Sequence, residues 1–146
     1  MNRKDVFDLT DKVIVITGGL GQIGRQFTLE LLDRGAKLAI FNRNIPDPSV
    51  LKERFPIDSD RLAFFAVDIT KKASVIAGLN ALVLMWGVPH VLINNAGLDT
   101  QPSAPPEVSG PFEDFPEDVW REVMEVNMTG TFFCCQIIGG AMAKLG

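Results

Sequence analysis

The fold of this chain is decided by residues 13–24, which read VIVITGGLGQIG. The four β-branched apolar residues at 13–16 predict a strand buried on both faces, and the four glycines after Thr17 predict a tight turn. A helix that begins at Gln22 would direct its unpaired amides and the positive end of its dipole toward that turn. Glycine also lets the backbone come close to a phosphate. The stretch therefore predicts a βαβ unit that holds the pyrophosphate of a dinucleotide.

A second polar cluster follows at the expected distance. Gly35 comes directly after the predicted helix, and residues 37–42 form a second apolar strand. The spacing from Gly24 to the pair Asn42–Arg43 is close to the ~20 residues that separate such a turn from the group that reads the adenosine ribose. A glycine turn alone also fits a strand-to-helix connection that binds nothing. The ordered second cluster favours nucleotide binding over that interpretation.

The composition disfavours several function classes. Fourteen basic and eighteen acidic residues give a net charge of −4 without a basic block, which disfavours nucleic acid as a partner. The charged N-terminus leads into no apolar signal segment, and no apolar run reaches the ~18 residues of a membrane span. The adjacent Cys134 and Cys135 make poor disulfide partners, so both are expected to be buried thiols in a reducing, cytoplasmic compartment. No metal site is predicted.

The order of the predicted elements gives the fold class. Strands are expected at 13–17, 37–42, 62–67 and 90–94, helices at 22–34, 48–55, 71–86, 116–126 and 128–144, and a proline-rich loop at 98–115. Alternating strands and helices predict one α/β domain over residues 1–146, with a Rossmann-like, doubly wound parallel sheet that stops after about four strands. The apolar face of helix 22–34 is expected to hold Ile23, Phe27, Leu31 and Leu32.

Polar clusters at the ends of all four predicted strands resemble those of the short-chain dehydrogenase/reductase family. The resemblance covers essentially the whole chain and corresponds to the N-terminal half of a typical member. It implies pyrophosphate binding by Thr17, Gly18, Gly21, Gln22, Ile23 and Gly24, and a cofactor-selecting role for Asn42 and Arg43. It also implies that Asp68 approaches the adenine amino group with Ile69 packed nearby, and that Asn95, Ala96 and Gly97 support the sheet and touch a ribose. Asn127 would order a water that relays protons to a catalytic lysine.

The match departs from the common pattern at the glycine turn. The usual family turn has glycine at position 22, whereas this chain has Gln22 and places the glycine at position 21. That spacing resembles the extended branch of sugar-nucleotide epimerases and dehydratases, while Asn94–Gly97 and Val126–Asn127 resemble the main dehydrogenase branch. Asn42 is neutral and Arg43 can contact a phosphate, so NADP is preferred over NAD as the cofactor.

The residues that carry the family's chemistry are not found in this chain. The resemblance implies a serine and a Tyr-x-x-x-Lys pair beyond helix 128–144, and the chain contains no tyrosine. His90 is interpreted as structural. We expect the cofactor-binding half of an NAD(P)-dependent oxidoreductase for a small alcohol or carbonyl substrate, inactive by itself. The alternatives are a non-catalytic dinucleotide-binding or interaction module and an extended-branch enzyme. Helix 128–144, apolar nearly all round, predicts a homo-oligomer.

Overall fold

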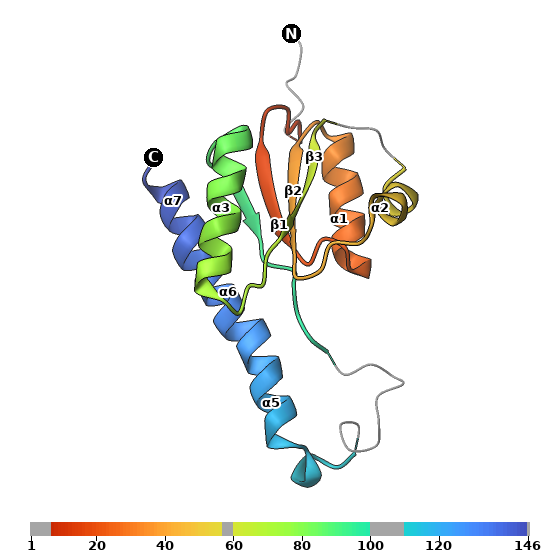
Figure 1. Cartoon of the computed structure of the whole chain (residues 1–146), viewed down its shortest axis with the longest axis vertical. Helices are drawn as coiled ribbons and strands as arrows, with labels where there is room; N and C mark the ends of the chain where they lie inside the picture. The colour runs from red at the N-terminus through yellow and green to blue at the C-terminus, as the bar shows by residue number, and fades with distance from the viewer. Residues whose placement is uncertain (1–6, 57–59, 100–109, 146) are drawn as a thin grey trace.

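The centre of the structure, a computed structural model that describes residues 7–56, 60–99 and 110–145, is a sheet of four parallel strands. The strands are β1 (Val13–Thr17), β2 (Lys37–Asn42), β3 (Leu62–Ala66) and β4 (Val91–Ile93), in the spatial order β3-β2-β1-β4 (Figure 1). The chain moves outward from β1 to β3 and then crosses back to the other side of β1. The predicted parallel sheet is therefore confirmed, and this strand order places its switch point between β1 and β4.

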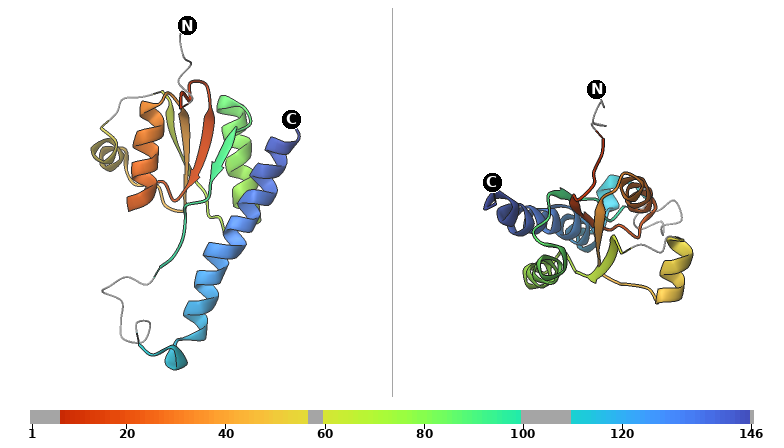
Figure 2. Two further views of the ribbon diagram at one scale, coloured as in Figure 1. Left: turned by 180° about the vertical axis from the view of Figure 1, so that it is seen from behind. Right: turned by 90° about the horizontal axis from the view of Figure 1, so that it is seen from above.

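Helices cover both faces of this sheet, as a doubly wound fold requires (Figure 2). On one face, α1 (Gln22–Asp33) and α2 (Pro48–Arg54) pack over Ile14, Ile16 and Ile40. On the other face, α3 (Lys72–Trp86) and the C-terminal helix pack over Val13 and Val15. Because successive side chains of β1 point to opposite faces, one apolar run supplies both cores.

The C-terminal helix corrects the sequence prediction. Two helices separated at Asn127 were expected, but one continuous helix runs from Glu117 to Ala143. Its segments are α5 (Glu117–Met124), η2 (Glu125–Gly130), α6 (Thr131–Cys134), η3 (Cys135–Gly139) and α7 (Gly140–Ala143). Of these, η2 and η3 are π-helical turns. A short 3₁₀-helix, η1 (Phe112–Asp114), precedes this long helix. The Asn127 side chain bonds to Leu98 rather than to its own helix, so it does not end the helix.

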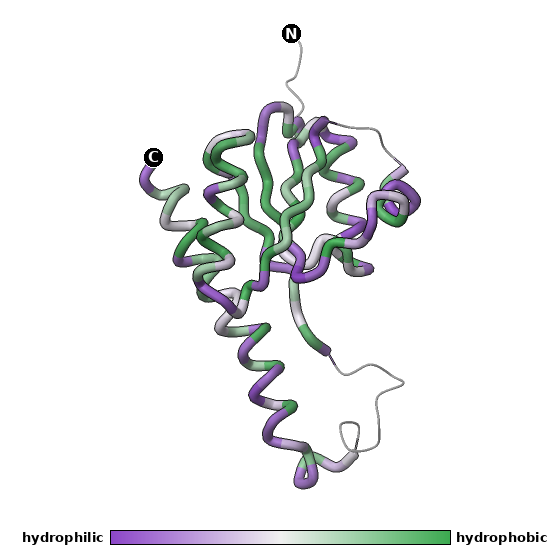
Figure 3. The backbone as a smooth tube through the Cα atoms, viewed as in Figure 1, coloured by the Kyte–Doolittle hydropathy of each residue, from purple (hydrophilic) through white to green (hydrophobic). Residues whose placement is uncertain are grey.

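Within the described part of the chain, the C-terminal helix packs against other elements along only part of its length. Cys134 and Ile138 are buried against α3 and the sheet, whereas Met128 and Phe132 are more than half exposed. Figure 3 shows apolar residues concentrated in the strands and in the upper half of this helix, and polar residues alternating with apolar ones below. Among the described residues it is the one helix long and apolar enough to span a membrane, a test that core helices of soluble proteins also pass.

The buried face of α1 agrees with the prediction only in its second half. Gly24, Thr28 and Leu32 are buried, while Ile23 and Phe27 are largely exposed. Glycine at position 24 lets the helix approach the turn closely, and the hydroxyl of Thr28 donates to the carbonyl of Gly24 at 2.8 Å. The predicted Leu31 and Leu32 therefore contribute to the core, whereas the small residues Gly24 and Thr28 take the buried positions expected for Ile23 and Phe27.

The two cysteines behave differently, although both are free thiols. Burial raises the pKa of the Cys134 thiol to about 11, in line with the expected buried thiol. Cys135 is exposed, and its sulfur accepts a hydrogen bond from Nδ2 of Asn94 at 3.3 Å. The expectation that both would be buried is wrong for Cys135 because neighbouring helical residues point in different directions.

Candidate functional site

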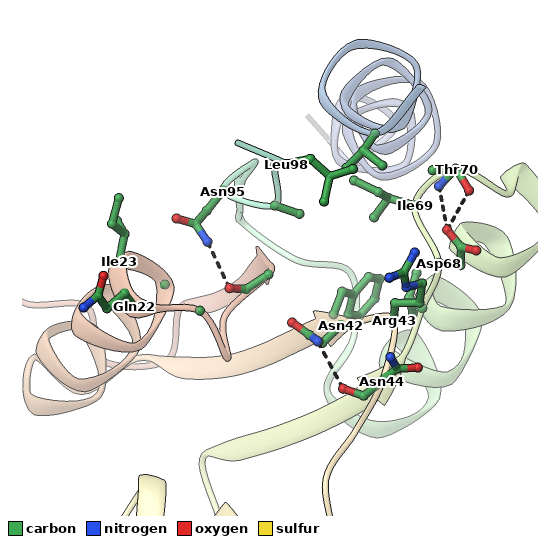
Figure 4. Close-up of a pocket in the computed structure, with 18 residues that line it drawn as sticks. Gln22, Ile23, Asn42, Arg43, Asn44, Asp68, Ile69, Thr70, Asn95 and Leu98 are labelled. Carbon is green, nitrogen blue, oxygen red and sulfur yellow. Dashed lines mark hydrogen bonds between the residues drawn. The ribbon is translucent and has the colours of Figure 1, made fainter. Parts of the chain in front are cut away.

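A cavity of about 450 Å³ lies at the carboxyl ends of the strands, at the switch point of the sheet (Figure 4). Every predicted cofactor-binding residue except Thr17 lines it: Gly18, Gly21, Gln22, Ile23, Gly24, Asn42, Arg43, Asp68, Ile69, Asn95, Ala96 and Gly97. Sequence reasoning missed Phe41, Asn44, Val67, Thr70, Leu98 and Val126, which also line it. Each of these directly adjoins a predicted residue or Asn127 in the chain, so proximity to the predicted clusters is the signal that could have found them.

The glycine turn forms one wall of the cavity. Gly18 has a φ of +66°, which favours glycine, and its amide donates to the carbonyl of Phe41 at 2.8 Å. A Cβ on Gly24 would lie 2.5 Å from the carbonyl oxygen of Gly18. The helix α1 begins after Gly21 with no side-chain hydrogen bond capping it. The first amides of α1 are therefore available to an anion in the cavity, as the sequence predicted.

Thr17 and Asn95 join β1 to the segment after β4. The buried hydroxyl of Thr17 accepts hydrogen bonds from the amides of Asn95 at 3.1 Å and Ala96 at 3.0 Å. In return, Nδ2 of Asn95 donates to the carbonyls of Thr17 and Gly18, each at 3.0 Å, and Figure 4 shows the second of these bonds. Thr17 therefore lies behind the cavity wall, where it holds two cavity-lining segments together.

The segment after β2 supplies neutral and basic groups to the cavity. Nδ2 of Asn42 donates to the carbonyl of Asn44 at 3.0 Å, which fixes a tight bend around Arg43. Arg43 is exposed at the cavity rim, and the residues at 42–44 bring no acidic side chain to it. An adenosine ribose placed here would meet a positive charge and amides, which is a surface suited to phosphate.

Among the described residues that line the cavity, the segment after β3 supplies the one carboxylate, Asp68. Oδ1 of Asp68 accepts from the amide of Thr70 at 3.1 Å and from its hydroxyl at 2.7 Å, and Nζ of Lys71 lies 3.4 Å from Oδ2. These interactions, with the Thr70 hydroxyl contributing most, hold the pKa of Asp68 below its usual value. The carboxylate is therefore ionised near neutral pH and able to accept from an amino group.

Asn127 acts on the cavity indirectly. The amide of Leu98 donates to Oδ1 of Asn127 at 2.7 Å, and Nδ2 of Asn127 donates to the carbonyl of Leu98 at 2.9 Å. Both polar atoms of the side chain are thus engaged in anchoring the segment after β4 to the C-terminal helix. Its predicted role in a proton relay stays a prediction.

Other candidate chemistry has structural explanations. Nδ1 of His90 accepts a hydrogen bond from the amide of Val13 at 3.0 Å, which confirms its structural interpretation. Within residues 7–56, 60–99 and 110–145, no three His, Cys, Asp or Glu side chains gather in a way that could hold a metal. The cavity of Figure 4 is therefore the candidate functional site.

The chain is similar to known dehydrogenases over nearly its whole length. It is 30% identical over 140 residues to an NAD-dependent glycerol dehydrogenase of Listeria innocua, covering 96% of this chain and 51% of that protein. It is 28% identical over 140 residues to a D-threitol dehydrogenase of Mycolicibacterium smegmatis, with the same two coverages. The chain thus spans about half the length of the curated relatives it matches.

Solved structures give the same result. ElxO with NADP bound superposes with a TM-score of 0.80 at 26% identity, covering 92% of this chain and 51% of that one. A short chain dehydrogenase of Leptospira borgpetersenii with bound NAD+ gives 0.74 at 28% identity, covering 94% and 49%. The family model for short chain dehydrogenases matches residues 12–145. The chain belongs to the short chain dehydrogenase family.

Proposed function

We propose that this chain binds NADP(H) and is the cofactor-binding half of an oxidoreductase acting on a small alcohol or carbonyl compound. The observation that carries the proposal is the cavity at the switch point. The uncapped start of α1 lies at one wall, and Arg43 and Asp68 lie at another. NADP and NAD are bound in two similar solved structures, which supports a nicotinamide dinucleotide as the ligand.

Each part of the cavity suits one part of such a dinucleotide. The amides at the start of α1 and the glycine turn would hold the pyrophosphate, which needs donors and no side chains. Asp68 would accept from the adenine amino group, and Ile69 would pack on the ring. Asn95, Ala96 and Gly97 would face the nicotinamide ribose. The bound cofactor supplies hydride transfer, and this chain binds and orients it.

Arg43 supports NADP as the preferred cofactor. A guanidinium can form two hydrogen bonds with a 2′-phosphate, whereas an acidic residue at the end of β2 would repel it. Position 42 is Asn42, so no such repulsion arises from that side chain. The curated relative from Listeria is NAD-dependent, so the residues after β2 rather than the relatives carry this part of the proposal.

The same proposal holds that this sequence alone is catalytically inactive. No tyrosine occurs in the chain, so the acid/base group of the family is not supplied by residues 1–146. We also propose that the chain self-associates through its C-terminal helix, because Met128 and Phe132 on that helix are exposed. The alternative of a non-catalytic binding module is favoured by the missing Tyr-x-x-x-Lys pair and disfavoured by the presence of Asn127. The extended-branch alternative rests on the Gly21 spacing alone.

Fluorescence titration with NADPH and NADH tests this proposal. We expect both to bind at micromolar to millimolar concentration, NADPH about tenfold more tightly, and no turnover of added alcohols or carbonyls. Binding of neither dinucleotide would overturn the proposal. Turnover by the pure chain would overturn its inactivity. If a longer natural product transfers hydride from deuterated NADPH to an external carbonyl, the extended-branch alternative is excluded.

A further inference from the structure

Two arginines that do not line the cavity, Arg25 and Arg54, connect the glycine turn with α2 and α1. Arg54, the last residue of α2, donates from Nη1 to the carbonyl of Leu20 at 3.1 Å. The backbone carbonyl of Arg54 accepts in turn from Nε of Arg25 at 2.8 Å, and Arg25 belongs to the first turn of α1. We call Arg25 and Arg54 the arginine brace. It links the end of α2, the turn and the start of α1.

Apolar packing beside the arginine brace also holds the end of α2 against the glycine turn. Leu20 is the one large side chain in the glycine turn, and it is buried with Ile40 of β2 and with Phe55, which directly follows Arg54. Phe55 also packs near the centre of this small core, with an exposed fraction of 2%. The end of α2 is therefore fixed on the turn by packing as well as by hydrogen bonds.

The brace acts on one particular peptide group. The carbonyl of Leu20 and the amide of Gly21 belong to the same peptide plane, and that amide donates to the carbonyl of Gly18 at 3.0 Å. Arg54 therefore fixes the oxygen end of a plane whose N–H end is fixed by Gly18. Gly21 is the residue from which α1 begins, so this plane sets the direction of the first helical amides. A turn rich in glycine has many accessible conformations, and the hydrogen bond from Arg54 to the carbonyl of Leu20 restricts them.

The charge of the brace fits the same role. A cation in the first turn of a helix is unfavourable because it faces the positive end of the dipole. Arg25 lies in the first turn of α1, and its guanidinium donates a hydrogen bond to the carbonyl of Arg54, the last residue of α2. The positive charge of Arg25 lowers the stability of the protein without a ligand, and the same charge attracts an anion to the start of α1. Neither arginine lines the cavity, so both would act without touching the ligand.

We propose that Arg25 and Arg54 are positioning residues for pyrophosphate binding: they hold the Leu20–Gly21 peptide, and thereby the start of α1, in the orientation that accepts the phosphates. The inference rests on the proposed function, because it concerns the same cavity. It adds residues from α2 and α1 that no sequence motif singled out. It predicts a defect confined to ligands that carry a pyrophosphate.

The test compares three probes on the wild-type chain and on Arg54→Met, Arg54→Lys and Arg25→Met. The probes are NADPH, ADP-ribose (a pyrophosphate without nicotinamide) and adenosine 2′-monophosphate (neither pyrophosphate nor nicotinamide). We expect Arg54→Met to weaken NADPH and ADP-ribose about tenfold and to leave the monophosphate within about twofold. Arg54→Lys keeps the positive charge and can still donate to the carbonyl of Leu20, so it should recover most of the loss. Arg25→Met should show a smaller loss with the same ligand pattern.

Arg121→Met is the matched control, because it removes one positive charge from an exposed pair with Glu117 on α5. Unchanged binding is expected for all three probes, and thermal unfolding without ligand reports whether each variant folds. Equal weakening of all three probes by Arg54→Met, or wild-type affinity for ADP-ribose in a folded Arg54→Met, would overturn the brace. If the wild-type chain binds neither dinucleotide probe, the proposed function itself fails.

Discussion

Replacing Gly24 by alanine is the sharpest perturbation of the cavity wall. The new Cβ would lie 2.5 Å from the carbonyl oxygen of Gly18, 2.7 Å from Nδ2 of Asn95 and 2.7 Å from Cα of Gly19. Two of these atoms are backbone, so relief requires α1 and the turn to separate by about 1 Å, toward the ~3.5 Å of an ordinary contact. Overpacking of this kind costs ~1–3 kcal/mol in the free energy of unfolding.

Cofactor affinity should fall by more than the stability change implies. A separation of about 1 Å exceeds the ~0.5 Å range of good N–H···O distances, so amide hydrogen bonds to the pyrophosphate would be lost or lengthened. Losing one hydrogen bond to a charged group costs ~1.5–3 kcal/mol. A loss of ~2 kcal/mol corresponds to a roughly 30-fold higher Kd for NADPH. Fluorescence titration measures the Kd, and urea unfolding measures the stability.

Gly140→Ala provides the control for this prediction. Gly140 begins α7, and a Cβ there would meet nothing within 4 Å. Alanine in a helix is favoured over glycine by ~1 kcal/mol, so this variant should be slightly more stable and should bind NADPH like the wild type. The reasoning is refuted if Gly24→Ala retains both the stability and the NADPH affinity of the wild-type chain.

Three further predictions follow from the site and the cores. Arg43→Met should weaken NADPH about tenfold and NADH less than twofold, measured by parallel titrations; equal losses would remove Arg43 from 2′-phosphate recognition. Folding lowers the pKa of Asp68 from 3.8, so its contribution to stability is present above that value and lost as the pH falls through the lower folded pKa. Asp68→Asn should therefore lose less stability than the wild type on acidification below about pH 4, and identical acid unfolding profiles would contradict this. At neutral pH an alkylating reagent should modify Cys135 rapidly and Cys134, whose pKa is raised to about 11, only after denaturation. Equal rates by mass spectrometry would contradict the packing of α6.

The sheet and its ligand edge could be predicted because local sequence patterns determine them. The apolar run at 13–16 and the polar residues after each strand, such as Asp68 and Asn95, specify strands whose carboxyl ends share one edge. The predicted strand bounds differ from the observed ones by one residue at most, as for β3 and β4. The prediction missed residues such as Phe41 and Leu98, which line the cavity because they are next to a predicted residue in the chain.

The remainder depends on contacts between distant segments, which a local pattern does not contain. The helix does not end at Asn127 because that side chain bonds to Leu98, 29 residues earlier. The buried face of α1 is set by the closeness of Gly24 to the turn, so Ile23 and Phe27 remain exposed despite their apolar spacing. The proline residues at 102, 105 and 106, on which the predicted loop partly depended, lie outside the described residues.

Amide chemical-shift mapping of the isotopically labelled chain with NADP+ is the most direct test of whether the cavity binds a dinucleotide. We expect the perturbed amides to cluster at residues 18–24, 42–44, 68–70 and 95–98, four of the segments that line the cavity. Amides of the C-terminal helix beyond Gly130 should change little. An absence of perturbation at saturating NADP+, or perturbation concentrated on that helix, would contradict the assignment of the cavity as a dinucleotide site.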